Sequence, residues 1–301
     1  MTRTQGFNQA TGKWAGSAEV YSGEGRFVGN GTDRRNVQQV GPDRIRIDLS
    51  FVGPFKFAGH YFIEDRKTER LYQGPVNVGY AEPLSETLVD SNSYWAATGF
   101  SQRFFLMVLP GGQRQVSMAQ LSRGDQLIYT VVGENYKVDD AFEGIPGLVN
   151  GSAYDFDHDP AAGRGEIFLH RRGTWRGVLS VLDENMNEMP AMEYAESITP
   201  NGNRLDVTLT GAAFDPAPVS VKLTTNGYQA WSEPGEVVGS YNLCGGRALS
   251  GHFQHLRPSL RVWRREVVTH EGDQKAVVHL WYRGGQRIGA QFGILTFEPG
   301  A

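Results

Sequence analysis

The residues best suited to chemistry lie near the C-terminus of this 301-residue chain, on two neighbouring segments. Residues 270–274 are typical of a turn between two antiparallel strands. Pairing outward from this turn places Trp263 opposite Trp281 on one face. By the same pairing, Arg265 lies opposite His279 on that face. We therefore predict that His279 and Arg265 are catalytic and that the two indole rings are ligand contacts, because this combination suits a planar conjugated ligand carrying an oxygen or a carboxylate.

The sequence leaves open which way this face points. If it faces the interior of a barrel, it forms an aromatic platform beside a cation and a proton donor or acceptor; if it faces outward, it is a surface stripe of Trp and Arg. Because side chains alternate along each strand, we expect a register error of one residue to leave the four residues together. The opposite face would carry Arg264 and Glu266. Tyr282 is a further predicted ligand contact.

Two histidines, His252 and His255, precede these strands. On a helix this kind of spacing supports a metal site, but residues three apart on a strand point to opposite faces. We therefore predict no metal ion, and His252 is predicted to contact the ligand. Cys244, the only cysteine, is more typical of a small buried residue than of a nucleophile. The sequence contains no phosphate loop and no Gly-x-Ser-x-Gly elbow for a nucleophilic serine. No cofactor is predicted.

A run of acidic residues lies in the middle of the chain. Asp155, Asp157, Asp159 and Glu166 stand at positions 1, 3, 5 and 12 of a calcium-loop pattern. Position 6 of that pattern calls for glycine, and here it is Pro160. No helical pattern flanks the segment, so an acidic linker is favoured over a cation site.

Alternation of apolar and polar residues, rather than helical periodicity, runs through the chain. Residues 44–51 place apolar side chains at every second position, and residues 55–64 repeat this pattern. Further strand-like segments recur every 8–12 residues with glycine-rich turns between them, which predicts an all-β barrel or sandwich with eight or nine strands in each half. One or two short helices are expected, within residues 138–150 or 184–197.

The first half carries several aromatic residues that are predicted to point inward. Phe51, Phe57, Tyr61 and Tyr129 belong to this group. We favour a filled core there over a second ligand site, although Tyr61 and Tyr129 are retained as predicted ligand contacts.

Strand patterns stop near residue 137 and resume at Ile167. We therefore predict an N-terminal domain at residues 1–137, a linker at 138–166 and a C-terminal domain at 167–301. Both halves begin with the same short segment, Gly12-Lys13-Trp14-Ala15-Gly16 in the first and Gly173-Thr174-Trp175-Arg176-Gly177 in the second. This repetition indicates an internal duplication.

The two Gly-x-Trp-x-Gly segments, each at the start of a barrel-sized string of strands, resemble the calycin superfamily of lipocalin-like barrels. The resemblance covers nearly the whole chain and implies two tandem antiparallel barrels. It also implies that Trp14 and Trp175 close one end of each barrel. Double-calycin proteins include relatives of bilin-attaching lyases, carotenoid hydratases and pericyclic enzymes. No catalytic residue of this sequence assigns it to one of these groups.

A lumen that contains His, Arg and Tyr predicts a cofactor-free enzyme of the isomerase, cyclase, hydratase or lyase type. Its substrate would be a hydrophobic, conjugated or aromatic small molecule bound in a barrel. A carrier that binds such a molecule without turnover is the first alternative. A protein-interaction scaffold with both barrels packed shut is the second.

The composition limits the expected partners. The net charge of −4 gives no overall basic field, so nucleic acid is not expected as a partner. No apolar run approaches the ~20 residues that span a bilayer, and the first residues do not resemble a signal peptide. We therefore expect a cytoplasmic protein whose partner is a hydrophobic small molecule, and a homodimer is compatible with this composition.

Overall fold

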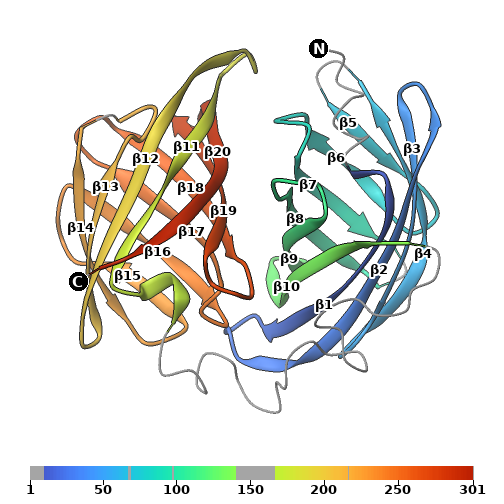
Figure 1. Ribbon diagram of the computed structural model, residues 1–301, viewed down its shortest axis with the longest axis horizontal. Coiled ribbons are helices and arrows are strands. Elements are labelled where there is room, and N and C mark those ends of the chain that lie inside the picture. The colour runs from blue at the N-terminus through green and yellow to red at the C-terminus, as the bar shows by residue number, and fades with distance from the viewer. Residues whose placement is uncertain (1–9, 67–68, 97, 140–166, 216, 301) are drawn as a thin grey trace. The chain divides into compact units, whose positions relative to one another are not determined.

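The computed structural model describes residues 10–66, 69–96, 98–139, 167–215 and 217–300. Within these residues the chain forms two compact units, each a closed antiparallel β-barrel (Figure 1). The predicted all-β class and the two tandem barrels are confirmed. The predicted number of strands is wrong, because each barrel closes with ten strands rather than eight or nine.

The first barrel is an up-and-down meander in which each strand pairs with its sequence neighbours and β1 also pairs with β10. Its strands are β1 (Gly12–Ser22), β2 (Phe27–Gly41), β3 (Arg44–Val52), β4 (Lys56–Asp65), β5 (Arg70–Gln73), β6 (Val78–Glu82), β7 (Leu88–Trp95), β8 (Phe100–Val108), β9 (Arg114–Arg123) and β10 (Gln126–Val138).

The second barrel repeats this topology, with β11 paired to both β12 and β20. A 3-10 helix, η1 (Phe168–His170), precedes β11. The strands are β11 (Gly173–Asp183), β12 (Glu188–Asn201), β13 (Arg204–Thr210), β14 (Val219–Thr225), β15 (Gln229–Ser232), β16 (Val237–Cys244), β17 (Ala248–His255), β18 (Leu260–Val268), β19 (Gln274–Arg283) and β20 (Gln286–Pro299). Among the described strands, closure pairs both edges of every barrel strand, which removes the usual site of edge-to-edge aggregation.

The predicted faces of β3 and β4 are confirmed. Phe51 pairs with Phe57, and Ile47 pairs with Tyr61. Each of these side chains lines the interior of the first barrel. Alternation along the sequence therefore identified the inward face of this hairpin correctly.

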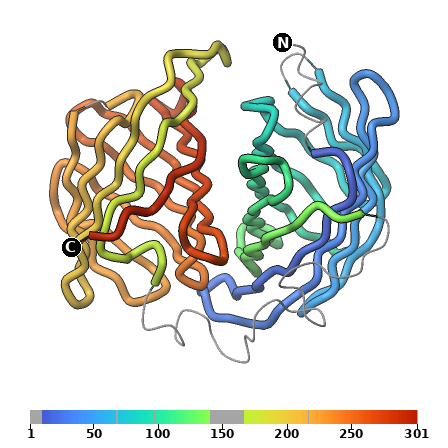
Figure 2. The backbone as a smooth tube through the Cα atoms, viewed as in Figure 1, coloured from blue at the N-terminus to red at the C-terminus, as the bar shows by residue number. Residues whose placement is uncertain are grey.

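Trp14 and Trp175 are buried in the first strand of their barrels, with 1% and 0% of their surface exposed. The Trp14 indole nitrogen donates a hydrogen bond to the carbonyl oxygen of Ala10 at 2.9 Å. The Trp175 ring packs against Phe297, with 4.9 Å between ring centroids. Both indoles are thus large core side chains of the strand that starts each barrel. Figure 2 traces the backbone of these two strands, β1 in blue and β11 in yellow-green.

The glycine that follows each of these tryptophans by two residues allows a close approach of the neighbouring strand. A Cβ atom added to Gly16 would lie 2.0 Å from the carbonyl oxygen of Glu134 on β10. One added to Gly177 would lie 2.4 Å from the carbonyl oxygen of Ile294 on β20. Both distances are far below van der Waals contact, so the second glycine of the motif permits closure between the first and last strands.

The prediction of a helix within residues 184–197 is wrong, because β12 occupies most of this range. Residues 140–166 lie outside the described residues. They include most of the predicted linker, the whole calcium-loop pattern and most of residues 138–150, the other range in which a helix was expected. Among the described residues, no group of three or more His, Cys, Asp and Glu side chains could hold a metal ion. No helix formed by these residues has the length and apolar character needed to cross a membrane.

Candidate functional site

The register between β18 and β19 separates the four residues that were predicted to share a face. Arg264, not Arg265, pairs with His279, and Val262 pairs with Trp281. His279 and Trp281 therefore point into the second barrel, while Trp263 and Arg265 lie on its outer face. The predicted pairing is wrong by one residue.

The cause is the length of the loop between these strands. Thr269 pairs with Gln274 through a backbone hydrogen bond of 2.9 Å, so the loop holds four residues rather than the five predicted. The Thr269 hydroxyl donates to the Asp273 carboxylate at 2.8 Å, and Gly272 adopts a φ of 75°. A shift of one residue in the pairing changes which faces of the two strands coincide. The expectation that such an error would leave the four residues together is therefore also wrong.

Four of the predicted site residues lie on the outer face of β17–β19. The guanidinium of Arg265 lies 4.5 Å from the centre of the Trp263 ring, and His252 stacks on that ring at 5.1 Å. Tyr282 lies under the guanidinium of Arg261 at 4.5 Å. Trp263, Arg265, His252 and Tyr282 thus lie on the outer face of these strands and do not line the lumen.

His255 confirms that the two neighbouring histidines point in opposite directions. It is buried, and its Nδ1 lies 2.7 Å from a carboxylate oxygen of Asp215. Its ring meets the Trp281 ring edge to face at 5.2 Å. His255 is therefore an interior residue of the second barrel, whereas His252 is an outer one.

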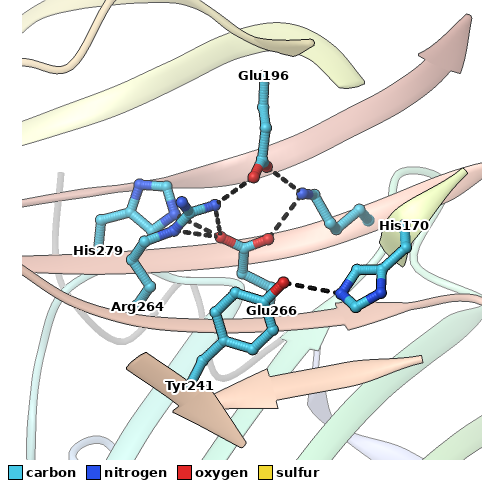
Figure 3. Close-up of polar contacts among 7 residues, drawn as sticks. His170, Glu196, Tyr241, Arg264, Glu266 and His279 are labelled. Atoms are coloured by element: carbon cyan, nitrogen blue, oxygen red, sulfur yellow. Dashed lines mark hydrogen bonds and ion pairs between the residues drawn. The ribbon is translucent and has the colours of Figure 1, made fainter. Parts of the chain in front are cut away.

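A buried network of charged side chains lies inside the second barrel (Figure 3). Arg264 donates hydrogen bonds to Glu266 at 2.8 Å and to Glu196 at 2.9 Å. Lys275 contacts the same two carboxylates, at 2.7 Å and 2.5 Å respectively. His279 Nε2 lies 3.0 Å from Glu266. Two cations and two carboxylates balance each other, which makes their burial tolerable.

The electrostatics of this network favour ionised carboxylates and a neutral His279. Burial alone would raise the pKa of Glu266, but Arg264 and Lys275 outweigh it and hold that pKa well below its usual range. Burial lowers the pKa of His279, although the hydrogen bond with Glu266 acts in the other direction. The ion pairs of this network join β12, β18 and β19.

η1 contributes another histidine, His170, to the interior of the second barrel. The Nε2 of His170 lies 2.7 Å from the hydroxyl of Tyr241 on β16 (Figure 3). Burial lowers the pKa of His170 to about 4. The adjoining cavity has a volume of about 20 Å³, enough for a single water molecule, and His279 is not among its lining residues.

Of the cavities inside the two barrels, the one in the first barrel is the larger, with a volume of about 110 Å³ against about 20 Å³ in the second. Stacked aromatic rings form one end of it, with 4.7 Å between the centroids of Phe51 and Phe55 and 4.9 Å between those of Phe57 and Trp95. Aliphatic side chains such as Val37 line the rest. The aromatic residues expected to fill this core do pack together, and the cavity lies beside them.

A small polar group faces this cavity. Asp33 and Arg35 form an ion pair, and Asn135 donates a hydrogen bond to Asp33 at 3.0 Å. The guanidinium of Arg35 also lies 5.4 Å from the centre of the Phe104 ring. Burial raises the pKa of Tyr61, which lines the same cavity, so its phenol stays protonated.

The two predicted tyrosines differ in their positions. Tyr61 lines the cavity, whereas Tyr129 packs against Phe55, with 5.3 Å between the ring centroids. Sequence reasoning missed Asp33 and Arg35 altogether. Their alternation within β2 is the signal that could have identified them, because two charged residues at every second position share a face with Val37.

Comparisons with known proteins identify the fold but not a family. No family model matches the sequence, and no curated protein matches it. A solved protein of unknown function from the DUF3598 family of Nostoc punctiforme PCC 73102 is similar over 99% of this chain and 100% of its own, with a TM-score of 0.61 and 14% identity. An S-type phycobiliprotein lyase, CPES, from Guillardia theta is similar over 46% of this chain and 94% of its own, with a TM-score of 0.36 and 10% identity. The first of these similarities shows that the two-barrel fold recurs over the whole chain.

Proposed function

We propose that this protein binds a hydrophobic small molecule, aromatic or conjugated, inside its first barrel. The observation that carries this proposal is the aromatic-walled cavity of about 110 Å³. Ligand sites in proteins are concave and mostly apolar, with a few polar groups that orient the ligand. An apolar cavity of ~150 Å³ is known to hold benzene, so the somewhat smaller space in the first barrel suits a single small ring.

Binding is favoured over turnover because the acidic residue that lines the cavity, Asp33, is held in an ion pair with Arg35. No histidine is among the described residues that line it. Asp33 is paired with Arg35, and the raised pKa of Tyr61 makes it a hydrogen-bond donor rather than a base. A carrier therefore fits these side chains better than the isomerase or lyase predicted from the sequence.

Benzene is a suitable first probe, and titration calorimetry measures its binding. The wild-type protein should bind it with one-to-one stoichiometry. Ala119→Phe, which fills the cavity from β9, should weaken binding at least about tenfold. Ala58→Phe adds the same ring at an exposed position of β4 and should bind as the wild type does. Equal affinity in the two variants would exclude the first-barrel lumen as the site.

We also infer that the chain is a duplicated calycin-like protein with domains at residues 1–137 and 167–301. The matched Gly-x-Trp-x-Gly strands, with both tryptophans buried at equivalent places, support this inference. Residues 167–301 expressed alone should then unfold in one cooperative transition. Loss of cooperative unfolding in that fragment would count against these boundaries.

A further inference from the structure

Tyr61 presents a hydrogen-bond donor to the first-barrel cavity. Its side chain lines the cavity, and burial raises the pKa of the phenol, so the hydroxyl keeps its proton. Among the described residues, no group accepts a hydrogen bond from this hydroxyl. A buried donor of this kind is stabilised when a ligand accepts a hydrogen bond from it.

Gln102 presents a second donor, and its neighbours set the direction of its amide. The amide oxygen accepts hydrogen bonds from the Trp95 indole nitrogen at 2.8 Å and from the Ser93 hydroxyl at 3.1 Å. Because an indole N–H group can only donate, the Gln102 atom that faces it must be the oxygen. The amide nitrogen therefore occupies the other branch, and no described residue accepts a hydrogen bond from it. Gln102 lines the same cavity as Tyr61.

Trp95 brings the two donors to one part of the cavity wall. The Tyr61 ring meets the Trp95 ring edge to face, with 5.8 Å between ring centroids, and Gln102 is bonded to the nitrogen of the same indole. Phe57 packs against the Trp95 ring at 4.9 Å. A ligand ring that packs beside Trp95 therefore lies close to both a phenol donor and an amide donor.

Two donors on one part of the wall favour a ligand with an acceptor group. A carbonyl oxygen has two lone pairs and no proton, so it can accept hydrogen bonds from a phenol and an amide together. The charged pair of the cavity argues against an anionic acceptor, because Arg35, the cation among the described lining residues, is already paired with Asp33. A carboxylate would lose its hydration without finding an uncompensated positive charge.

We infer that Tyr61 and Gln102 form a pair of donors that recognises a carbonyl oxygen, so that the first barrel selects a neutral, single-ring carbonyl compound. This inference rests on the proposed binding function and adds the chemical class of the ligand. A single ring is compatible with a cavity of about 110 Å³, and its one polar atom contacts only one part of the wall. The apolar wall supplies affinity, and the two donors supply selectivity.

Cyclopentanone and methylenecyclopentane are the probes that test this inference. They differ only in the exchange of the carbonyl oxygen for a CH2 group, and both have as many non-hydrogen atoms as benzene. Titration calorimetry measures the dissociation constant of each probe. Because the ketone gives up more hydration than the hydrocarbon does, the informative quantity is how the ratio of the two constants changes between protein variants.

Two variants remove one donor each. Tyr61→Phe deletes only the phenolic oxygen, so it should weaken cyclopentanone binding about two- to tenfold and leave methylenecyclopentane binding unchanged. Gln102→Glu keeps an oxygen for Trp95 and Ser93 but loses the amide donor. Above about pH 7, where a carboxylate only accepts hydrogen bonds, this variant should also weaken the binding of the ketone alone.

Tyr72→Phe is the matched control. It removes the same atom from another tyrosine that lines this cavity, and the hydroxyl of Tyr72 lies beside Ser91. The ratio of the two dissociation constants should therefore stay as in the wild type. Unchanged binding of methylenecyclopentane in all three variants also shows that they are folded.

The outcomes separate this inference from the proposed function. If benzene binds and neither Tyr61→Phe nor Gln102→Glu changes the ratio, the donor pair is wrong while binding in the first barrel stands. An equal effect of Tyr72→Phe and Tyr61→Phe would remove the special role of Tyr61. Acetate should not bind, and acetate binding that Tyr61→Phe weakens would assign the donors to anions. If neither benzene nor cyclopentanone binds to the folded wild-type protein, both the proposed function and this inference fail.

Discussion

Arg264 lies directly opposite His279 in the β18–β19 ladder, and both side chains contact the same oxygen of Glu266. Glu196 and Lys275 complete this network from β12 and β19. The contacts therefore join strands that are far apart in sequence through charges that are removed from water. This arrangement makes the interior of the second barrel sensitive to the loss of any one charge.

Removal of the central carboxylate should destabilise the second barrel strongly. Glu266→Leu leaves Arg264 and Lys275 with one carboxylate between them, and losing one partner of a buried ion pair costs about 3–5 kcal/mol. Urea unfolding measures this loss. Glu298→Ala is the control, because it removes an exposed pair with Arg176 and should cost under about 1 kcal/mol. Similar costs for the two variants would show that the buried network contributes little.

Stability should fall as the pH drops below the unfolded-state pKa of histidine. The pKa of His170 is about 4 in the folded protein, chiefly because of burial, with Lys275 acting in the same direction and Glu196 against it. His170 is therefore protonated below about pH 6.5 in the unfolded chain, but only below about pH 4 in the folded protein. Between pH 7.5 and 5 this difference costs about 2 kcal/mol.

His170→Gln tests this pH dependence, because glutamine can still bond to the Tyr241 hydroxyl but does not titrate. Denaturant unfolding at pH 7.5 and at pH 5 measures the change in stability for both proteins. The variant should lose about 2 kcal/mol less than the wild type over this interval. An identical loss in both proteins would assign the pH dependence to other groups.

Alanine at the second glycine of either motif should disturb barrel closure. Gly16→Ala and Gly177→Ala each bring a methyl group against a carbonyl oxygen of the last strand, and overpacking of this kind costs about 1–3 kcal/mol. Thermal unfolding measures the effect. At Gly235 the nearest atom to an added Cβ is 3.9 Å away, so Gly235→Ala should leave the melting temperature nearly unchanged. A neutral effect at Gly16 and Gly177 would contradict the close packing of the first and last strands.

The two tryptophans of the β18–β19 hairpin should differ in their contributions to stability. Trp281 is 2% exposed and packs inside the second barrel, so Trp281→Ala should cost about 3–5 kcal/mol. Trp263 lies on the outer face, half-buried beside His252, and its replacement should cost only about 1 kcal/mol. Equal costs in chemical denaturation would favour the pairing in which both rings share one face.

Several features of the fold follow from sequence pattern alone. The period-two alternation in residues 44–51 and 55–64 indicated which side chains point inward, and the structure agrees. The repeated segments around Trp14 and Trp175 indicated two barrels. These signals are local, because a strand with one buried face must alternate and because a repeated strand start marks a repeated unit.

The site depended on relationships that no local pattern contains. A loop of four residues instead of five, closed by Thr269 and Asp273, placed Arg264 rather than Arg265 beside His279. Whether a lumen is filled or hollow depends on how side chains from ten strands meet, as at Phe51, Phe57 and Trp95. The sequence by itself determined an all-β chain with two similar halves. Only the tertiary structure decided which faces meet and where the cavity lies, because register and packing volume arise from contacts between strands rather than within them.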